Sequence, residues 1–271
     1  MVIEDFFTCE NDEKPLDKLV NDGGLCGILR TVACIGDSLS SGEFEGTNDE
    51  GGKTYHDMYD YSWGQFMARM AGITVHNFSR GGMSAKWYLD SFADENGLWS
   101  LKLASKAYIL ALGVNDLNEN STLPVGTTDD VGSEDSVAPA GATFAGYYGK
   151  IIQKYKKIQP DAKFFFVTIP KSDWESESLS KKRDAHAKLL YEFTEYFSNS
   201  YVIDLRKYAP CYNAEFRKNF FLGGHMNAAG YIFTAKIMLS YIDYYIRHNM
   251  QDFKQIGFVG TPYENKADGK K

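Results

Sequence analysis

Short apolar runs separated by amphipathic stretches dominate the pattern along this chain. Five runs, bounded by turn residues and rich in β-branched and aromatic side chains, occupy residues 31–35, 74–78, 107–112, 163–169 and 201–205. Apolar residues at consecutive positions are typical of strands that are buried on both faces, as in a parallel sheet covered by helices. The pattern therefore predicts five strands of one central sheet.

Between these runs, apolar residues recur at helical spacing over residues 57–71, 142–158, 180–197 and 228–246. Gly72 provides a C-terminal stop for the first of these helices. Strands that alternate with helices require right-handed crossovers and helices on both faces of the sheet. We expect an α/β protein, a three-layer α/β/α sandwich with a central, mostly parallel five-stranded sheet of the flavodoxin-like type.

The apolar pattern indicates one domain with two flanking segments. We expect the domain to span residues 31–250, because no Pro- or Ser-rich linker and no internal repeat divides it. The first 30 residues hold a set of scattered apolar side chains, so this extension is expected to pack on the domain or on a partner subunit of a homo-oligomer. Residues 251–271 form a C-terminal tail.

The charge balance excludes several classes of partner. The 271 residues include 29 Lys+Arg and 36 Asp+Glu, which gives a formal net charge of −7. Nucleic-acid and anionic-membrane surfaces need clustered basic residues, so neither partner is expected. No apolar run approaches the roughly 20 residues that span a bilayer. Because acids stand at positions 4 and 5 where a signal peptide needs basic residues, we expect a soluble cytoplasmic protein.

Cofactor signatures are absent from the sequence. The four cysteines are scattered without a C-x-x-C pair, and no histidine has metal-ligand spacing with another histidine, a cysteine or a carboxylate. The phosphate-binding patterns G-x-x-x-x-G-K-[ST] and G-x-G-x-x-G are missing as well. We expect neither a metal nor another cofactor. His186, in a charged helix, is expected to be exposed.

Polar residues that suit acyl transfer follow the predicted strands. Ser38 comes after the first strand, Gly82 after the second and Asn115 after the third, while His225 precedes the last helix. Ligands of open parallel sheets bind beyond the carboxyl ends of the strands, which places these residues at one edge. Nucleophilic acyl transfer needs a hydroxyl, a base and neutral donors for the oxyanion.

This ordered set resembles the SGNH hydrolases, also called GDSL-type esterases and lipases, over about residues 31–246. The resemblance is carried by Gly36-Asp37-Ser38-Leu39-Ser40, Gly82, Gly113-Val114-Asn115-Asp116 and His225. It implies that Ser38 is the nucleophile and that His225 is its base. The Ser38 N–H, the Gly82 N–H and the Asn115 amide would bind the oxyanion. A small acyl ester, most of all an O-acetyl group on a carbohydrate, is the substrate that the resemblance implies.

One departure from the family pattern concerns the acid of the triad. The family carries Asp three residues before the histidine, where this chain has Leu222. A backbone carbonyl, such as that of Leu222, could orient His225, or Asp116 could substitute, or the protein could be inactive. In a serine protease the acid contributes about 3 × 10⁴ in rate against about 2 × 10⁶ for serine or histidine. We therefore favour a Ser38–His225 dyad with carbonyl support.

Some of these residues could have structural roles instead of catalytic ones. Ser38 could cap the following helix, and Asn115 could occupy a left-handed turn. A short-chain lipid or thioester hydrolase and a catalytically inactive carbohydrate-binding protein are the alternative functions.

Two further segments have open roles. The acidic loop 119–141 either borders the acyl pocket or is a solvated surface loop. The aromatic group Tyr55, Tyr59, Tyr61 and Trp63 either stacks on sugars or packs in the core.

Overall fold

A single parallel sheet forms the centre of the protein. The computed structural model describes residues 9–10 and 12–253. Five strands pair in the order β4-β1-β5-β6-β7, with every neighbouring pair parallel. Their bounds are β1 Thr31–Gly36, β4 Thr74–Ser79, β5 Ala107–Ala111, β6 Lys163–Val167 and β7 Ser200–Ile203. The five predicted strands and the flavodoxin-like order are confirmed.

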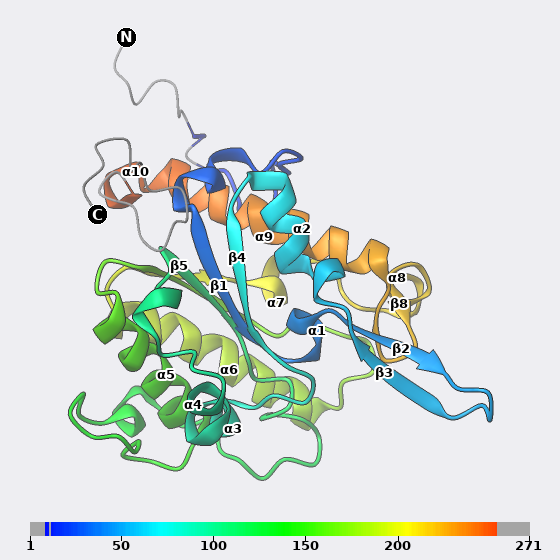
Figure 1. Ribbon diagram of the computed structural model, residues 1–271, viewed down its shortest axis with the longest axis horizontal. Coiled ribbons are helices and arrows are strands. Elements are labelled where there is room, and N and C mark those ends of the chain that lie inside the picture. Colours follow the sequence, from blue (N-terminus) through cyan, green and yellow to red (C-terminus); the bar gives the residue numbers. More distant parts are fainter. Residues whose placement is uncertain (1–8, 11, 254–271) are drawn as a thin grey trace, which may run out of the picture.

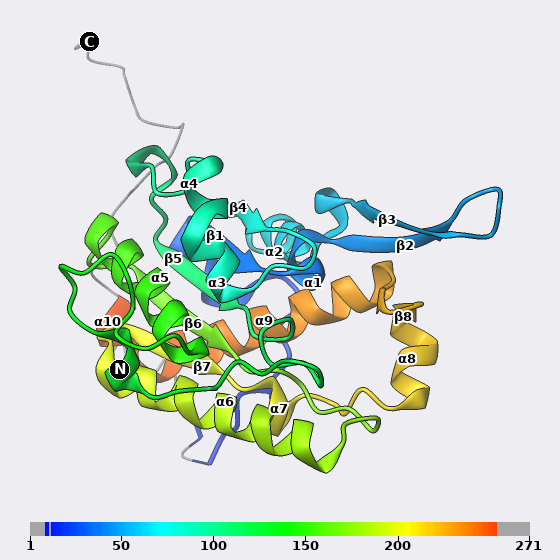
Figure 2. The same cartoon turned by 90° about the horizontal axis from the view of Figure 1, so that it is seen from below.

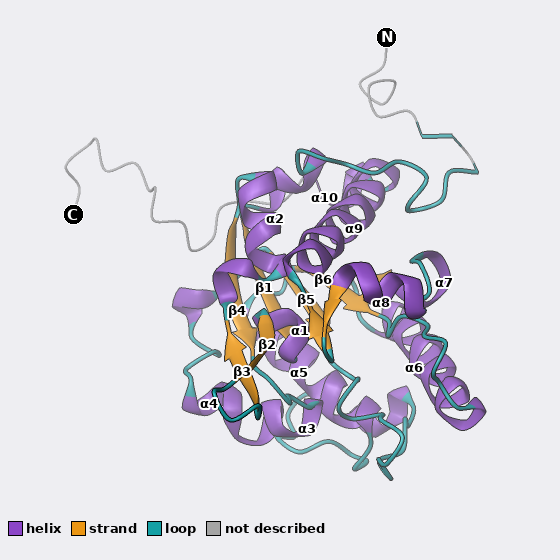
Figure 3. Ribbon diagram, turned by 90° about the vertical axis from the view of Figure 1, so that its right-hand side faces the viewer, coloured by secondary structure: helices purple, strands orange, loops and turns teal. Residues whose placement is uncertain are grey.

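Helices cover both faces of this sheet (Figure 1, Figure 3). On one face lie α2 (Trp63–Ala71) and α9 (Ala228–His248), and on the other lie α5 (Phe144–Ile158) and α6 (Glu177–Tyr196). Strand residues alternate between the two layers, so that Ile35 packs with α5 and Cys34 packs with α2 and α9. The expected three-layer sandwich is therefore confirmed.

Shorter elements connect these layers. The short helices are α1 Ser38–Ser41, α3 Ala85–Trp87, α4 Ala93–Glu95, α7 Leu205–Tyr208, α8 Ala214–Phe220 and α10 Met250–Phe253. Two antiparallel pairs lie outside the central sheet, β2 Glu43–Thr47 with β3 Lys53–Asp57 and β8 Phe221–Leu222 with β9 His225–Met226. The β2–β3 hairpin projects from the domain beside β8 (Figure 2).

One predicted helix begins later than expected. Residues 57–71 were predicted as helical, but β3 ends at Asp57 and α2 begins at Trp63. Ser62 caps α2 by accepting a hydrogen bond from the Gln65 N–H at 3.2 Å. Gly72 ends the helix in a left-handed conformation, as predicted.

The described part of the N-terminal extension lies against α9. The Val20 N–H donates to Ser240 Oγ at 3.0 Å and the Leu25 N–H donates to Asp243 Oδ1 at 2.8 Å. Most of the C-terminal tail is outside the described residues, which end at Phe253. No helix among the described residues has the length and apolar character needed to cross a membrane.

Candidate active site

Ser38 stands where β1 meets α1, next to the point at which the strand order reverses. The N-cap of α1 is Asp37, whose Oδ1 accepts a hydrogen bond from the Leu39 N–H at 3.0 Å. The capping role considered for Ser38 therefore belongs to its neighbour. Burial raises the pKa of Asp37 to about 6, and the charge of His225 acts in the opposite direction. His225 thus lies within electrostatic range of Asp37, the residue before Ser38.

Hydrogen bonds join the loop after β4, which contains Gly82, to the loop after β5, which contains Asn115. Asn115 Nδ2 donates to the Met83 carbonyl at 3.0 Å, and Asp116 Oδ1 accepts from the Ala85 N–H at 2.9 Å. A side-chain amide has two N–H donors, so Asn115 keeps one for another acceptor. Gly82 has a φ of 72°, a conformation that favours glycine, and a Cβ there would meet no atom within 4 Å. The space beside Gly82 is therefore open.

A carboxylate from the β2–β3 hairpin holds one nitrogen of His225. Glu45 Oε1 lies 3.0 Å from His225 Nδ1 and accepts the Gly224 N–H at 2.6 Å. Its other oxygen lies 3.1 Å from Lys53 Nζ. Burial acts to raise the pKa of Glu45, but the hydrogen bonds from His225, Lys53 and Gly224 outweigh it and lower the pKa below its ordinary value.

A second glutamate of the same strand contacts the other nitrogen. Glu43 Oε1 lies 2.9 Å from His225 Nε2, and burial raises the pKa of Glu43. A Cβ added at Gly81 would lie 2.2 Å from Glu43 Oε2, so this carboxylate fills the space between His225 and the loop after β4. A neutral imidazole has one N–H, so both contacts can be hydrogen bonds only with an imidazolium or a protonated Glu43.

The structure differs from both expected sources of the group that orients His225. The acceptor at Nδ1 is a carboxylate oxygen of Glu45, whereas a Leu222 carbonyl was favoured. Asp116 is buried and bonds the Ala85 N–H, and burial raises the pKa of its carboxyl to about 7. Glu45 was missed because the hairpin was not recognised, although the turn residues Asn48, Asp49, Gly51 and Gly52 are a sequence signal for a reversal of the chain at this point.

Other sequence-based expectations need correction as well. His186 was expected to be exposed, but it is fully buried, 5.1 Å from the Phe144 ring. A Cβ on Gly113 would lie 3.0 Å from His186 Nε2. Burial, followed by the charges of Arg206 and Arg183, lowers the pKa of His186 to about 3.

The aromatic group considered for sugar stacking is divided between core and surface. Trp63 is buried, while the Tyr59 hydroxyl donates to the Val75 carbonyl at 3.0 Å. Tyr55 and Tyr61 are exposed, and the Tyr55 ring lies edge-on to His225 at 5.9 Å between centroids. Tyr55 is therefore the member that borders the histidine.

A mostly apolar cavity of about 140 Å³ adjoins the Ser38 and Asn115 loops. Leu39 and Val114, the chain neighbours of Ser38 and Asn115, line it together with Ile169, Pro170, Ser172, Trp174, Arg183, Tyr212, Arg217, Phe221 and Gly224. No residue of the acidic loop 119–141 is among these lining residues, which favours the alternative of a solvated surface loop.

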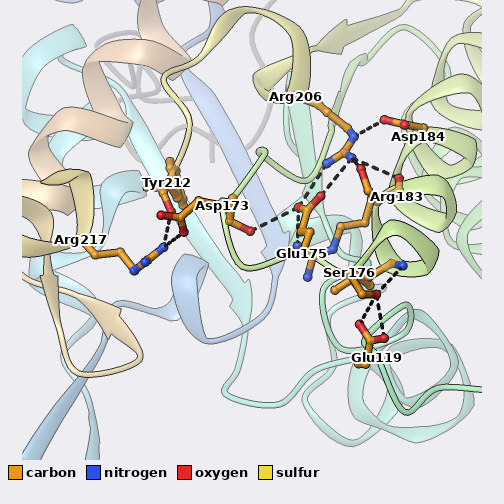
Figure 4. A network of polar contacts seen from close by, with 12 residues as sticks. Glu119, Asp173, Glu175, Ser176, Arg183, Asp184, Arg206, Tyr212 and Arg217 are labelled. Carbon is orange, nitrogen blue, oxygen red and sulfur yellow. Dashed lines mark hydrogen bonds and ion pairs between the residues drawn. The ribbon is translucent and has the colours of Figure 1, made fainter. Parts of the chain in front are cut away.

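The loop after β6 is anchored on both sides of Trp174, which is 58 % exposed. Figure 4 shows that Asp173 pairs with Arg217 on one side. On the other side Glu175 pairs with Arg183 at 2.8 Å and with Arg206 at 3.1 Å. These ion pairs hold the exposed indole at the wall of the cavity.

A set of potential metal ligands gathers far from this site. Ligand atoms of Cys9, Glu13 and His248 lie within 4.8 Å of one another, although sequence spacing gave no sign of them. Arg247 already bonds both Glu13 oxygens, at 2.7 and 2.9 Å, which disfavours a cation there. His248 is at the opposite end of α9 from His225, roughly 30 Å away by helical rise.

The sequence profile of the GDSL-like lipase/acylhydrolase family matches residues 34–232. This range contains the Ser38, Gly82, Asn115 and His225 loops and all of the parallel sheet except residues 31–33 of β1. The class of protein defined by this match and by the fold is an SGNH-type esterase. The chain belongs to the GDSL-like lipase/acylhydrolase family. No curated protein matches the chain.

Several solved structures share the fold. A carbohydrate esterase family 2 enzyme with a carbohydrate-binding domain from Corynascus thermopiles (Myceliophthora fergusii) is 15 % identical, with a TM-score of 0.56 over 79 % of this chain and 65 % of that one. A family two carbohydrate esterase from Clostridium thermocellum, in complex with cellohexaose, is 14 % identical, with a TM-score of 0.56 over 82 % of this chain and 65 % of that one. A family 3 carbohydrate esterase from Clostridium thermocellum is 14 % identical, with a TM-score of 0.51 over 80 % of this chain and 97 % of that one. At these identities the likeness concerns the fold.

Proposed function

We propose that the protein hydrolyses small acyl esters, above all O-acetyl groups of carbohydrates, with Ser38 as nucleophile and His225 as base. The observation that carries this proposal is the arrangement around His225. Its Nδ1 is held by the buried carboxylate of Glu45, and its ring is close enough to Asp37, the residue before Ser38, to act on it electrostatically. A histidine fixed in this way is suited to accept a serine proton on Nε2.

The reaction follows from the chemistry of these groups. Ser38 Oγ attacks the acyl carbon and transfers its proton to His225 Nε2. The N–H groups of Ser38 and Gly82 and the second amide N–H of Asn115 stabilise the oxyanion. His225 then protonates the leaving alcohol, and water releases the acid by the reverse sequence of proton transfers. Before the first step, Nε2 must exchange its contact with Glu43 for Ser38 Oγ.

The surroundings of the site favour a small acyl group on a sugar. The cavity beside Leu39 and Val114 is smaller than the roughly 300–1,000 Å³ of sites for drug-sized ligands. Tyr55 and Trp174 are exposed aromatic side chains near His225 and on the cavity wall, and exposed aromatic rings can pack against the apolar faces of sugars. Carbohydrate esterases among the similar structures, one in complex with cellohexaose, support the same substrate class.

A fluorophosphonate probe tests this proposal. We expect covalent labelling of wild-type protein and of the matched control Ser40→Ala, and no labelling of Ser38→Ala. Mass spectrometry of peptides locates the adduct.

Hydrolysis assays complete the test of substrate class. We expect p-nitrophenyl acetate and acetylated xylo-oligosaccharides to be cleaved, and p-nitrophenyl octanoate to be cleaved much more slowly. Folded protein that is neither labelled nor active on any ester would refute the proposal and favour a carbohydrate-binding protein. Preference for the octanoate would refute the acetyl assignment and favour a lipid esterase.

A further inference from the structure

We propose that Glu45, carried by the β2–β3 hairpin, is the positioning carboxylate of His225 and takes the place of the aspartate missing at Leu222. This inference rests on the proposed function, because a positioning acid has a role only where His225 is the base. It assigns the third member of the triad to a segment 180 positions before the histidine.

The turn before His225 is shaped around the Glu45 carboxylate. A Cβ added at Gly223 would lie 2.1 Å from Glu45 Oε2, and one added at Gly224 would lie 2.6 Å from Glu45 Oε1. Side chains at either position would displace the carboxylate. The Gly224 N–H also donates to Oε1, so the turn provides both the space and a hydrogen bond. The side chain of Glu45 is consequently only 8 % exposed.

The hairpin that carries Glu45 is anchored at its base. Ser41 Oγ donates to Asp57 Oδ1 at 2.7 Å, and the Tyr231 hydroxyl donates to the Glu43 carbonyl at 2.6 Å. Phe44, between the two glutamates, faces the other way and packs on Tyr231 at 5.3 Å between centroids. Because side chains alternate along a strand, the packing of the partly buried Phe44 on Tyr231 turns Glu43 and Glu45 to the face that carries His225.

The two glutamates have different chemical roles because they contact different nitrogens. A carboxylate at Nδ1 fixes the tautomer that leaves Nε2 free to accept a proton, and it stabilises the imidazolium that forms. Glu45 has this position. Glu43 is at Nε2, where it occupies the place that Ser38 Oγ needs. The orienting function therefore falls to Glu45.

Kinetics of Glu45 variants on p-nitrophenyl acetate test the inference. Glu45→Gln keeps the size of the side chain, and we expect kcat to fall by about 10²- to 10⁴-fold, in line with removal of the acid in serine proteases. KM should change by less than about threefold, because the lost interaction strengthens in the transition state. The isosteric control Glu50→Gln, at the exposed hairpin tip, should retain wild-type kcat.

A spectroscopic measurement tests the contact without depending on activity. We expect a downfield proton resonance of the His225 Nδ1–H in wild-type protein and in Ser38→Ala, shifted or lost in Glu45→Gln and unchanged in Glu50→Gln. Its presence in protein without esterase activity would refute the proposed function alone. An unchanged resonance in Glu45→Gln, or a kcat within about threefold of wild type in an active enzyme, would overturn the role of Glu45.

Discussion

The two halves of the candidate site are built in different ways. Ser38, Gly82 and Asn115 follow strands of the central sheet, most of whose residues are buried. Glu43 and Glu45 lie on a two-stranded hairpin outside the sheet, whose second strand is largely exposed. His225 lies between them, at the start of β9 and ahead of α9.

This difference shows which positions of the site are fixed by the sheet and which can be supplied by other segments of the chain. The proposed nucleophile and oxyanion donors depend on the sheet, because its carboxyl edge brings their loops together. The orienting carboxylate needs only to reach Nδ1, and any anchored segment near the histidine can supply it. A hairpin insertion after α1 can therefore replace an aspartate in the loop before the histidine.

Among three further substitutions that probe this comparison, the largest effect is expected at Asn115, on the sheet side. Asn115→Ala removes a proposed oxyanion donor and the bond to the Met83 carbonyl, so kcat on p-nitrophenyl acetate should fall by about 10²- to 10³-fold. Asn120→Ala, which removes an exposed amide five residues on, is the matched control and should stay within about threefold of wild type. A kcat for Asn115→Ala equal to that of the control would show that the sheet side does not bind the oxyanion.

A smaller effect is expected where the hairpin meets the histidine turn. In Gly224→Ala the new Cβ would lie 2.6 Å from Glu45 Oε1, so the carboxylate must retreat from Nδ1. Misplacement of a catalytic group by about 1 Å can cost about 10²-fold, and we expect kcat to fall by about 10- to 100-fold. Steady-state assays on p-nitrophenyl acetate measure this fall. Gly51→Ala, at the hairpin tip, strains a turn with a φ of 79° but adds a Cβ with no atom within 4 Å, so it controls for distortion of the hairpin itself.

The smallest effect on rate is expected at Asp116, the carboxylate of the sheet side. If Asp116 oriented His225, Asp116→Asn would slow the enzyme as strongly as Glu45→Gln. We expect kcat to change by less than about tenfold, because Asp116 bonds the Ala85 N–H and an asparagine oxygen can accept the same bond.

The same substitution should change the pH dependence of stability. The pKa of Asp116 is raised from 3.8 to about 7 by burial, so between these values the folded state holds a proton that the unfolded state releases. The free energy of unfolding therefore falls as pH rises from about 4 to 7, by about 1.4 kcal/mol per unit of pKa shift. Asp116→Asn removes this contribution, and thermal unfolding at pH 5 and 8 should show a smaller decrease in Tm than wild type.

Much of the fold was predictable because its signals are local. Consecutive apolar residues in 107–112 predict a buried strand without any knowledge of its neighbours in the fold, and β5 forms at Ala107–Ala111. The motif residues Ser38 and His225 were recognised from short patterns near strand and helix ends. Glu45 could not be found in this way, because its partner is 180 positions away and their contact depends on how a projecting hairpin folds back. His186 was misjudged for a similar reason, since charged neighbours in sequence hid its packing against Phe144.

The most direct test of the account is a double-mutant cycle between the hairpin and the histidine. Glu45→Gln is introduced into wild-type protein and into His225→Ala, and kcat/KM on p-nitrophenyl acetate is measured for all four proteins. Residues that act as one unit are not additive, so Glu45→Gln should lower kcat/KM by about 10²-fold or more in wild type and by less than about twofold in His225→Ala. Equal losses in the two backgrounds would contradict a carboxylate that acts through His225.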